Sequence, residues 1–251
     1  MFPQEENTNR FIAHWNPCSS VVKLLFPGST VWLVIAIPSV LAQSSRMAFE
    51  SLGSNAVDLE RFELAIRRFD EVNAHDPNLE EVAGELQPRE LVHARRLTEW
   101  VFKLCPNASE TLWLAARCQH ISRWEMPRSA YPMTRAGYLE WRNALKAFHA
   151  EKAGKILGEA GYPIETIHLV QQLNLKKNFP HDFESRVLED ALCLVFLQYQ
   201  LDDLAAKTPD GKMVNALRKS WQKMTPAGRE LALKLSLGQR EQALVERALG
   251  M

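Results

Sequence analysis

Residues whose side chains could do chemistry gather in one segment, 114–150. It contains five arginines, two histidines and three aromatic residues: Arg117, Arg123, Arg128, Arg135, Arg142, His120, His149, Trp124, Tyr138 and Trp141. Guanidinium groups bind phosphate or carboxylate through paired hydrogen bonds, and they stack on aromatic faces. One arginine alone is usually a solvated surface charge, but five beside histidines favour a pocket for an anionic small molecule. The basic side chains that we expect to bind it are Arg117, Arg123, Arg128, Arg142 and Lys152.

Three histidines and one acid form a second set of candidates. His93, His120 and His149 each fall on a different predicted helix, and Asp190 lies in the apolar sequence VLEDALCLVFLQ. A carboxylate among apolar neighbours needs a cation or a metal to compensate its burial. Imidazole and carboxylate together can bind Mn, Fe, Mg or Zn, so these four residues are the predicted ligands of a divalent metal. Two alternatives remain open: each histidine could be a core residue, and Asp190 could form a structural salt bridge with an arginine.

The elements that must position these residues are predicted to be helices almost throughout. Apolar spacing, prolines and capping residues predict helices at about 59–73, 88–104, 109–124, 135–160, 164–177 and 184–206, with two more after Pro209 and after Thr225-Pro226. No alternating segment of strand length stands out. The sequence therefore predicts an all-α fold of about seven to nine helices. We expect a helical domain over 59–206 and a helical C-terminal extension, 207–251, packed on it.

Residues 1–58 have a different character and are expected to form a poorly structured extension outside the core. The apolar run at 31–42 is interrupted by Pro38 and is too short to span a bilayer as a helix, which takes about 20 residues. It could belong to a signal peptide, or native translation could begin at Met47. Membrane contact is expected only if the run is retained. The cytoplasm is the expected compartment, with organellar or secretory targeting by residues 1–46 left open.

Composition excludes several classes of function. Thirty basic residues balance thirty acidic ones, so no overall field attracts nucleic acid. The four cysteines lie far apart, which argues against a zinc ribbon and a disulfide scaffold. The chain also lacks a glycine-rich phosphate loop, a nucleophile elbow and the signatures of aminoacyl-tRNA synthetases.

The order of the histidines resembles the HD superfamily of metal-dependent phosphohydrolases. His93-Ala-Arg-Arg-Leu and Leu114-Ala-Ala-Arg-Cys-Gln-His120 resemble its first two histidine helices, and Phe148-His149 resembles a later one. Leu188-Glu-Asp190 falls where the last acidic ligand would be. The resemblance implies an HD-like fold and hydrolysis assisted by a metal ion. However, Ile121 follows His120 where the HD signature has an aspartate ligand.

A second resemblance is more specific. Ala65-Ile-Arg-Arg-Phe-Asp70 with Asn73 and Asp76-Pro77, the sequence around His120, Trp141-Arg142 and Leu188-Glu-Asp190 are similar to a family of unknown function, DUF4202. That family implies no activity. We therefore expect an HD-like domain that binds a phosphorylated or otherwise anionic small molecule, with metal-dependent phosphoester hydrolysis as its reaction if it is an enzyme. The alternatives are a ligand-binding or regulatory module that has lost the metal, and a purely structural interaction domain.

Overall fold

The computed structural model describes residues 22–26, 29–33 and 56–250, which belong to two separate units divided between Glu50 and Ser51. In the first unit, β1 (Val22–Phe26) pairs antiparallel with β2 (Ser29–Leu33). The apolar run predicted at 31–42 therefore begins in a strand. The rest of that run, Met47 and most of the expected targeting segment lie outside the described residues.

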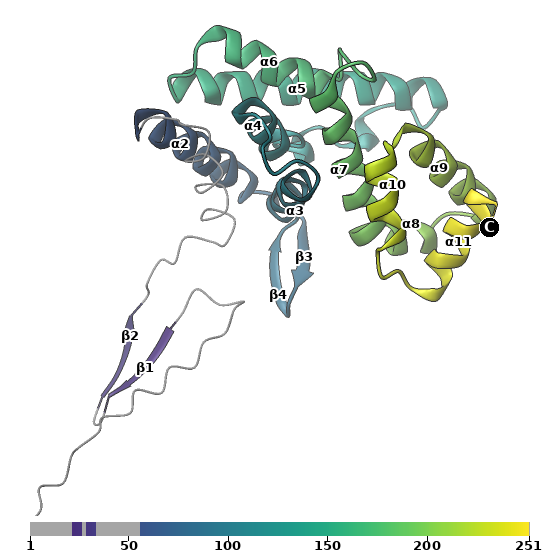
Figure 1. The fold of residues 1–251 in the computed structure, drawn as a ribbon, viewed down its shortest axis with the longest axis horizontal. Helices are drawn as coiled ribbons and strands as arrows, with labels where there is room; N and C mark the ends of the chain where they lie inside the picture. The colour runs from purple at the N-terminus through teal and green to yellow at the C-terminus, as the bar shows by residue number, and fades with distance from the viewer. Residues whose placement is uncertain (1–21, 27–28, 34–55, 251) are drawn as a thin grey trace, which may run out of the picture. The chain divides into compact units, whose positions relative to one another are not determined.

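The second unit is all-α, as predicted (Figure 1). Over residues 56–250 its ten helices are α2 (Ala56–Asn73), α3 (Arg89–Leu104), α4 (Glu110–Cys118), α5 (Arg135–Glu159), α6 (Ile164–Leu175), α7 (Phe183–Tyr199), α8 (Leu201–Ala206), α9 (Asp210–Lys223), α10 (Pro226–Leu233) and α11 (Gln239–Leu249). None of the helices in the described residues combines the length and apolar character needed to cross a bilayer.

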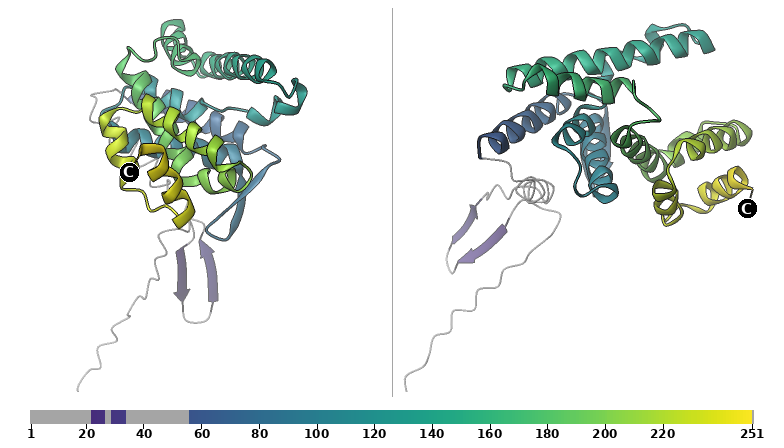
Figure 2. Two further views of the ribbon diagram at one scale, coloured as in Figure 1. Left: turned by 90° about the vertical axis from the view of Figure 1, so that its right-hand side faces the viewer. Right: turned by 45° about the horizontal axis from the view of Figure 1, so that its top comes forward.

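Helices α3, α4 and α7 form the centre of this unit. The helix α3 packs against both α4 and α7, the long helix α5 lies along α6, and α10 packs on α7 (Figures 1 and 2). Leu97 from α3, Leu112 and Leu114 from α4 and Leu194 from α7 are fully buried between them. Burial of each such side chain contributes about 1.5–3 kcal/mol, so this apolar core fixes the helices that carry the candidate site.

Side-chain caps define where several helices begin. Ser109 accepts a hydrogen bond from the backbone N–H of Leu112, and Thr225 accepts one from Gly228. Each cap satisfies an N–H group that the first turn would leave unpaired, and the helix after Thr225-Pro226 was predicted from the sequence.

The structure differs from the predicted elements in four places. The strands β3 (Leu79–Val82) and β4 (Glu85–Pro88) form a hairpin where none was expected. Its two-residue turn has positive φ at both Ala83 and Gly84, and alanine at the first position hid this signal. The helix predicted at 109–124 ends at Cys118, and the one at 184–206 is divided at Gln200. An additional helix, α11, follows α10.

Candidate functional site

The end of α2 and the start of α3 are held together by one buried carboxylate. The Oδ2 atom of Asp76 accepts a hydrogen bond from the backbone N–H of Glu90 at 3.0 Å, and its Oδ1 atom accepts from the N–H and the side-chain amide of Asn78. Asp76 thereby satisfies an N–H group in the first turn of α3. That turn carries Glu90, and His93 follows one turn later on the same face.

The turn after α4 is fixed in a similar way. Ser122 is fully buried and has a left-handed backbone with φ of 53°. Its N–H donates to the side-chain oxygen of Asn73, at the end of α2, at 3.2 Å. Since this conformation is unfavourable for residues other than glycine, the hydrogen bond to Asn73 helps to hold it. This turn positions His120 and Ile121 just after the end of α4.

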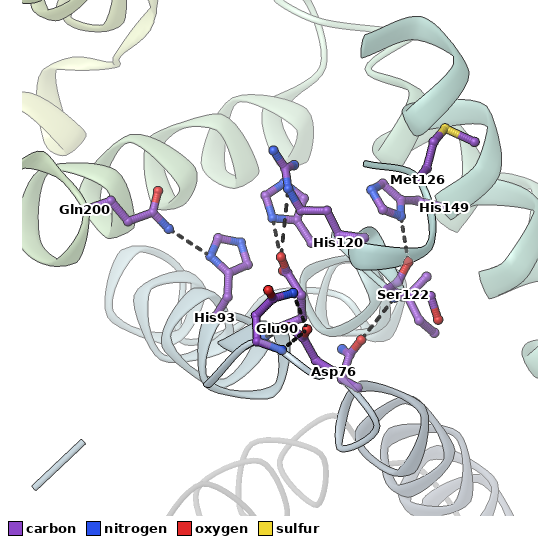
Figure 3. Close-up of polar contacts among 12 residues, drawn as sticks. Asp76, Glu90, His93, His120, Ser122, Met126, His149 and Gln200 are labelled. Atoms are coloured by element: carbon purple, nitrogen blue, oxygen red, sulfur yellow. Dashed lines mark hydrogen bonds and ion pairs between the residues drawn. The ribbon is translucent and has the colours of Figure 1, made fainter. Parts of the chain in front are cut away.

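The structure brings the three candidate histidines together (Figure 3). The ring of His120 stacks on that of His93 with a centroid separation of 4.2 Å and an interplanar angle of 12°. On its other side, the ring of His149 lies 5.8 Å away and is tilted by 35°. His93 and His149 are buried, whereas 24% of the His120 side chain is exposed. His120 is therefore the member of this histidine cluster that a ligand can reach directly.

Hydrogen bonds set the proton positions on the two buried rings. Nδ1 of His149 lies 2.7 Å from the carbonyl oxygen of Ile121, which can only accept, so Nδ1 carries the proton. Gln200 donates its amide to Nδ1 of His93 at 3.3 Å. The Nε2 atoms of both His93 and His149 are buried and have no hydrogen-bond partner. Ile121, where the HD signature has aspartate, is itself buried in the core and serves the cluster through its carbonyl group.

All three histidines are held neutral near pH 7. Burial and the neighbouring ring of His120 lower the pKa of His93 to about 3. Burial and the charge of Arg123 lower the pKa of His149 to about 4, against the hydrogen bond to Ile121, which raises it. Burial, Arg123 and His149 also hold the pKa of His120 well below its ordinary value. The charge of Arg123 thus adds to burial at each of the three rings.

Glu90 is a member of the site that the sequence analysis missed. Its carboxylate Oε2 lies 3.6 Å from Nδ1 of His120, and its Oε1 lies 3.8 Å from Nε of Arg123 (Figure 3). Its side chain is 9% exposed, and burial raises its pKa. The signal that could have identified it is its place three residues before His93, one turn earlier on the same helix face.

Asp190 does not join the histidines. Its carboxylate accepts hydrogen bonds from the backbone N–H and the hydroxyl of Thr225. A Cβ atom at Gly228 would lie only 2.5 Å from this carboxylate, so glycine permits the close packing of α10 on α7. Asp190 therefore contacts Thr225 in place of the predicted metal or an arginine. Through this contact it holds α10 against α7.

The chemistry of the donors suits a divalent metal, but their arrangement does not. Imidazole nitrogens coordinate metals along lone pairs in the ring plane, at about 2.0–2.1 Å for zinc. Because the rings of His93 and His120 are stacked and nearly parallel, their lone pairs do not converge on one ion. Among the described residues, no three His, Cys, Asp or Glu side chains are placed so that they could hold a metal.

Two neighbouring cavities adjoin the histidine cluster. The first, of about 420 Å³, lies between α5, α6 and α7, and we call it the cationic cavity. Its charged lining consists of Arg123, Arg142, Lys146, Lys176 and Glu189. The second, of about 520 Å³, lies toward the β3–β4 hairpin and is called the hairpin cavity. Both cavities are lined by His120 and Arg123.

Of the five basic residues expected to bind an anion, Arg123 and Arg142 line the cationic cavity. Arg117 instead forms a buried, paired salt bridge with Asp70 at 2.6 Å for both bonds. Arg128 donates to the carbonyl oxygens of Tyr131, Pro132 and Thr134, and so holds the loop before α5. Lys152 pairs with Glu125. These three side chains line neither cavity, because their donors are used within the fold.

The cationic cavity is also lined by two lysines, Lys146 and Lys176, that are not among the five basic residues expected to bind an anion. Lys146 follows Arg142 by four residues and precedes His149 by three, so the three share one face of α5. Lys176 ends α6 and binds the buried carboxylate of Glu189, which also accepts a hydrogen bond from Lys223 at 3.2 Å. The lysines hold the pKa of Glu189 below its usual value despite its burial.

The chain matches the family described as Domain of unknown function (DUF4202) over residues 63–245, and it belongs to that family. This match spans α3 to α10, so it includes the histidine cluster and the cationic cavity. No curated protein is matched by the chain. No solved structure is matched by it either.

Proposed function

We propose that this protein binds a phosphorylated or otherwise anionic small molecule in the cationic cavity, beside the histidine cluster. The observation that carries the proposal is the unbalanced positive charge of the cavity wall. Arg142 and Lys146 have no acidic partner within ion-pair distance among the described residues. Burial and the charges of Arg142 and Lys176 lower the pKa of Lys146, which indicates that these cations repel one another. A bound anion would relieve this repulsion.

The histidine cluster would supply a neutral, polar end to the same cavity. His120 is uncharged near pH 7 and reaches the cavity, so it can exchange a hydrogen bond with the ligand without adding further charge. His93 and His149 lie on either side of its ring and restrict its movement. The cavity volume of about 420 Å³ is typical of small-molecule sites.

Metal-dependent phosphoester hydrolysis is a second candidate function. The bare, buried Nε2 atom of His149 favours it, because histidines that bind metals commonly donate their other ring nitrogen to a backbone carbonyl, as His149 does to Ile121. The stacking of His93 on His120 counts against it. Titration of the purified protein with Mn²⁺, Zn²⁺ and Mg²⁺ tests this candidate. A rise in melting temperature that His149→Gln removes would support it, and an unchanged melting temperature would refute it.

Ligand-induced stabilisation tests the proposed binding. Phosphate, sulfate and a set of phosphorylated metabolites are added to the purified protein, and the melting temperature is recorded, because a ligand that binds only the folded state raises it. The variants Arg142→Gln and His120→Gln should lose the stabilisation. Lys155→Gln is the matched control, since Lys155 is exposed on the same helix and lines neither cavity. If no anion raises the melting temperature, or if Lys155→Gln acts as Arg142→Gln does, the proposal is wrong.

A further inference from the structure

The charges that line the cationic cavity indicate how much negative charge its ligand carries. Four cationic side chains, Arg123, Arg142, Lys146 and Lys176, face one carboxylate, Glu189, which leaves an excess of three positive charges. The histidines do not alter this balance, because burial and nearby cations keep them neutral. The further ion-pair partners of Arg123 and Glu189 do not alter it either, since Glu90 and Lys223 bring one charge of each sign.

One phosphate group would leave this excess partly uncompensated. A phosphate monoester carries about −1.5 to −2 at pH 7, so a single group would neutralise only about half to two thirds of three charges. Two phosphate groups carry about −3 or more and would match it. We propose, on the basis of the anion binding proposed above, that the ligand of the cationic cavity is a diphosphate or a bisphosphate rather than a monophosphate.

The cations lie on more than one wall, which is the arrangement that two phosphate groups need. Arg142 and Lys146 lie one turn apart on α5, Lys176 lies at the end of α6, and Arg123 follows α4 beside His120. Glu189 binds both Lys176 and Lys223 and so holds the α6 side of the cavity in place. Multiple charge-assisted hydrogen bonds from separate walls favour a ligand with several acceptor groups.

The organic part of such a ligand has a place in the adjoining hairpin cavity. The two cavities share Phe196, Gln200 and Leu204 in addition to His120 and Arg123. An organic group could extend past His120 while the phosphates stay among the cations. The charged lining of the hairpin cavity is balanced, so this cavity is less suited to phosphate than the cationic cavity is. It contains four basic side chains (Arg89, Arg96, Arg123 and Lys207) and four acidic ones (Glu80, Glu90, Asp202 and Asp203).

Calorimetric titration of the full chain with inorganic pyrophosphate and with inorganic phosphate tests the inference. Each phosphate group adds its own charge-assisted hydrogen bonds, so pyrophosphate should bind at least about tenfold more tightly than phosphate. Arg142→Gln and Lys146→Gln should each weaken pyrophosphate binding more than phosphate binding, so the ratio of the two affinities should decrease. Lys155→Gln should leave both affinities unchanged. Circular dichroism of each variant confirms that it is folded.

The outcomes separate this inference from the proposed function. If phosphate and pyrophosphate bind equally tightly and Arg142→Gln weakens both, the cavity binds anions but the inference about two phosphate groups is wrong. If neither binds, the proposed function fails as well. Binding of pyrophosphate that Arg142→Gln and Lys146→Gln leave unchanged would place the site elsewhere and overturn both.

Discussion

Replacement of Arg117 by alanine separates the arginines that hold the fold from those that line the cavity. Arg117 donates from Nε and from a terminal nitrogen to the two oxygens of Asp70, each at 2.6 Å. Its side chain is 7% exposed and that of Asp70 is 23% exposed. We expect Arg117→Ala to destabilise the protein strongly and to leave its affinity for anions unchanged.

The magnitude follows from the contacts that the variant loses. Removal of one partner of a buried ion pair costs about 3–5 kcal/mol, because the other charge remains buried without compensation. Here the cost lies near the lower limit, since Asp70 is partly exposed and Arg95 remains 4.0 Å from its carboxylate. We therefore expect the free energy of unfolding to fall by about 3 kcal/mol. For a unit of this size that corresponds to a decrease in melting temperature of about 6–12 °C.

Urea unfolding followed by tryptophan fluorescence measures the change. Arg67→Ala is the matched control, because Arg67 is exposed and lies 4.0 Å from Glu71, an ion pair expected to contribute less than about 0.5 kcal/mol. Asp70→Asn combined with Arg117→Ala should cost less than the sum of the two single changes. A loss below about 1 kcal/mol in Arg117→Ala, or a loss of anion affinity with stability retained, would contradict the structural role.

Three further predictions concern the supports of the histidine cluster. The pKa values of His93 and His149 are about 3 and about 4 in the folded protein, below the ordinary 6.5, so the unfolded chain binds more protons as pH falls from 6.5. The free energy of unfolding should therefore decrease as pH falls below 6.5, by up to about 1.4 kcal/mol per pH unit for each ring. Urea unfolding at about pH 7 and about pH 5.5 should show a smaller decrease in His149→Gln than in the wild type. Equal decreases in the two proteins would contradict the lowered pKa of His149. Asp190→Ala should lose about 2 kcal/mol of stability, and Asp190→Asn should lose less because an amide oxygen still accepts from Thr225. If a divalent metal raises the melting temperature of the wild type but not of Asp190→Ala, Asp190 is a metal ligand after all. Asn73→Ala removes the acceptor of the Ser122 N–H and should lower anion affinity through His120, which a titration with phosphate would detect; unchanged affinity would show that this bond does not position the ring.

The sequence predicted the helical class, because apolar spacing repeats along each helix. It also placed the three histidines in one hypothetical ligand set with Asp190, of which the structure brings the histidines together but not Asp190. His93, His120 and His149 lie at the apolar faces of α3, α4 and α5 or just beyond them, and packing of those faces brings the rings together. The helix start at Thr225 was likewise recognisable, since a cap acts within a few residues of the chain.

Contacts between residues far apart in the chain could not be predicted in the same way. Arg117 resembled a ligand-binding arginine until the structure placed it against Asp70, 47 residues earlier. Asp190 had the apolar neighbours expected of a metal ligand, yet its carboxylate accepts hydrogen bonds from Thr225 at the start of another helix. In both residues the sequence showed a buried charge that needed a partner, but not which partner would reach it.

The most direct test of the account is to locate a bound anion in a crystal of the protein soaked with tungstate, a phosphate analogue with a strong anomalous signal. The account predicts tungstate in the cationic cavity, within hydrogen-bond distance of Arg142, Lys146 or Lys176 and close to His120. Tungstate that binds only outside this cavity, with the cavity open and free of anion at concentrations that saturate other sites, would contradict the central claim.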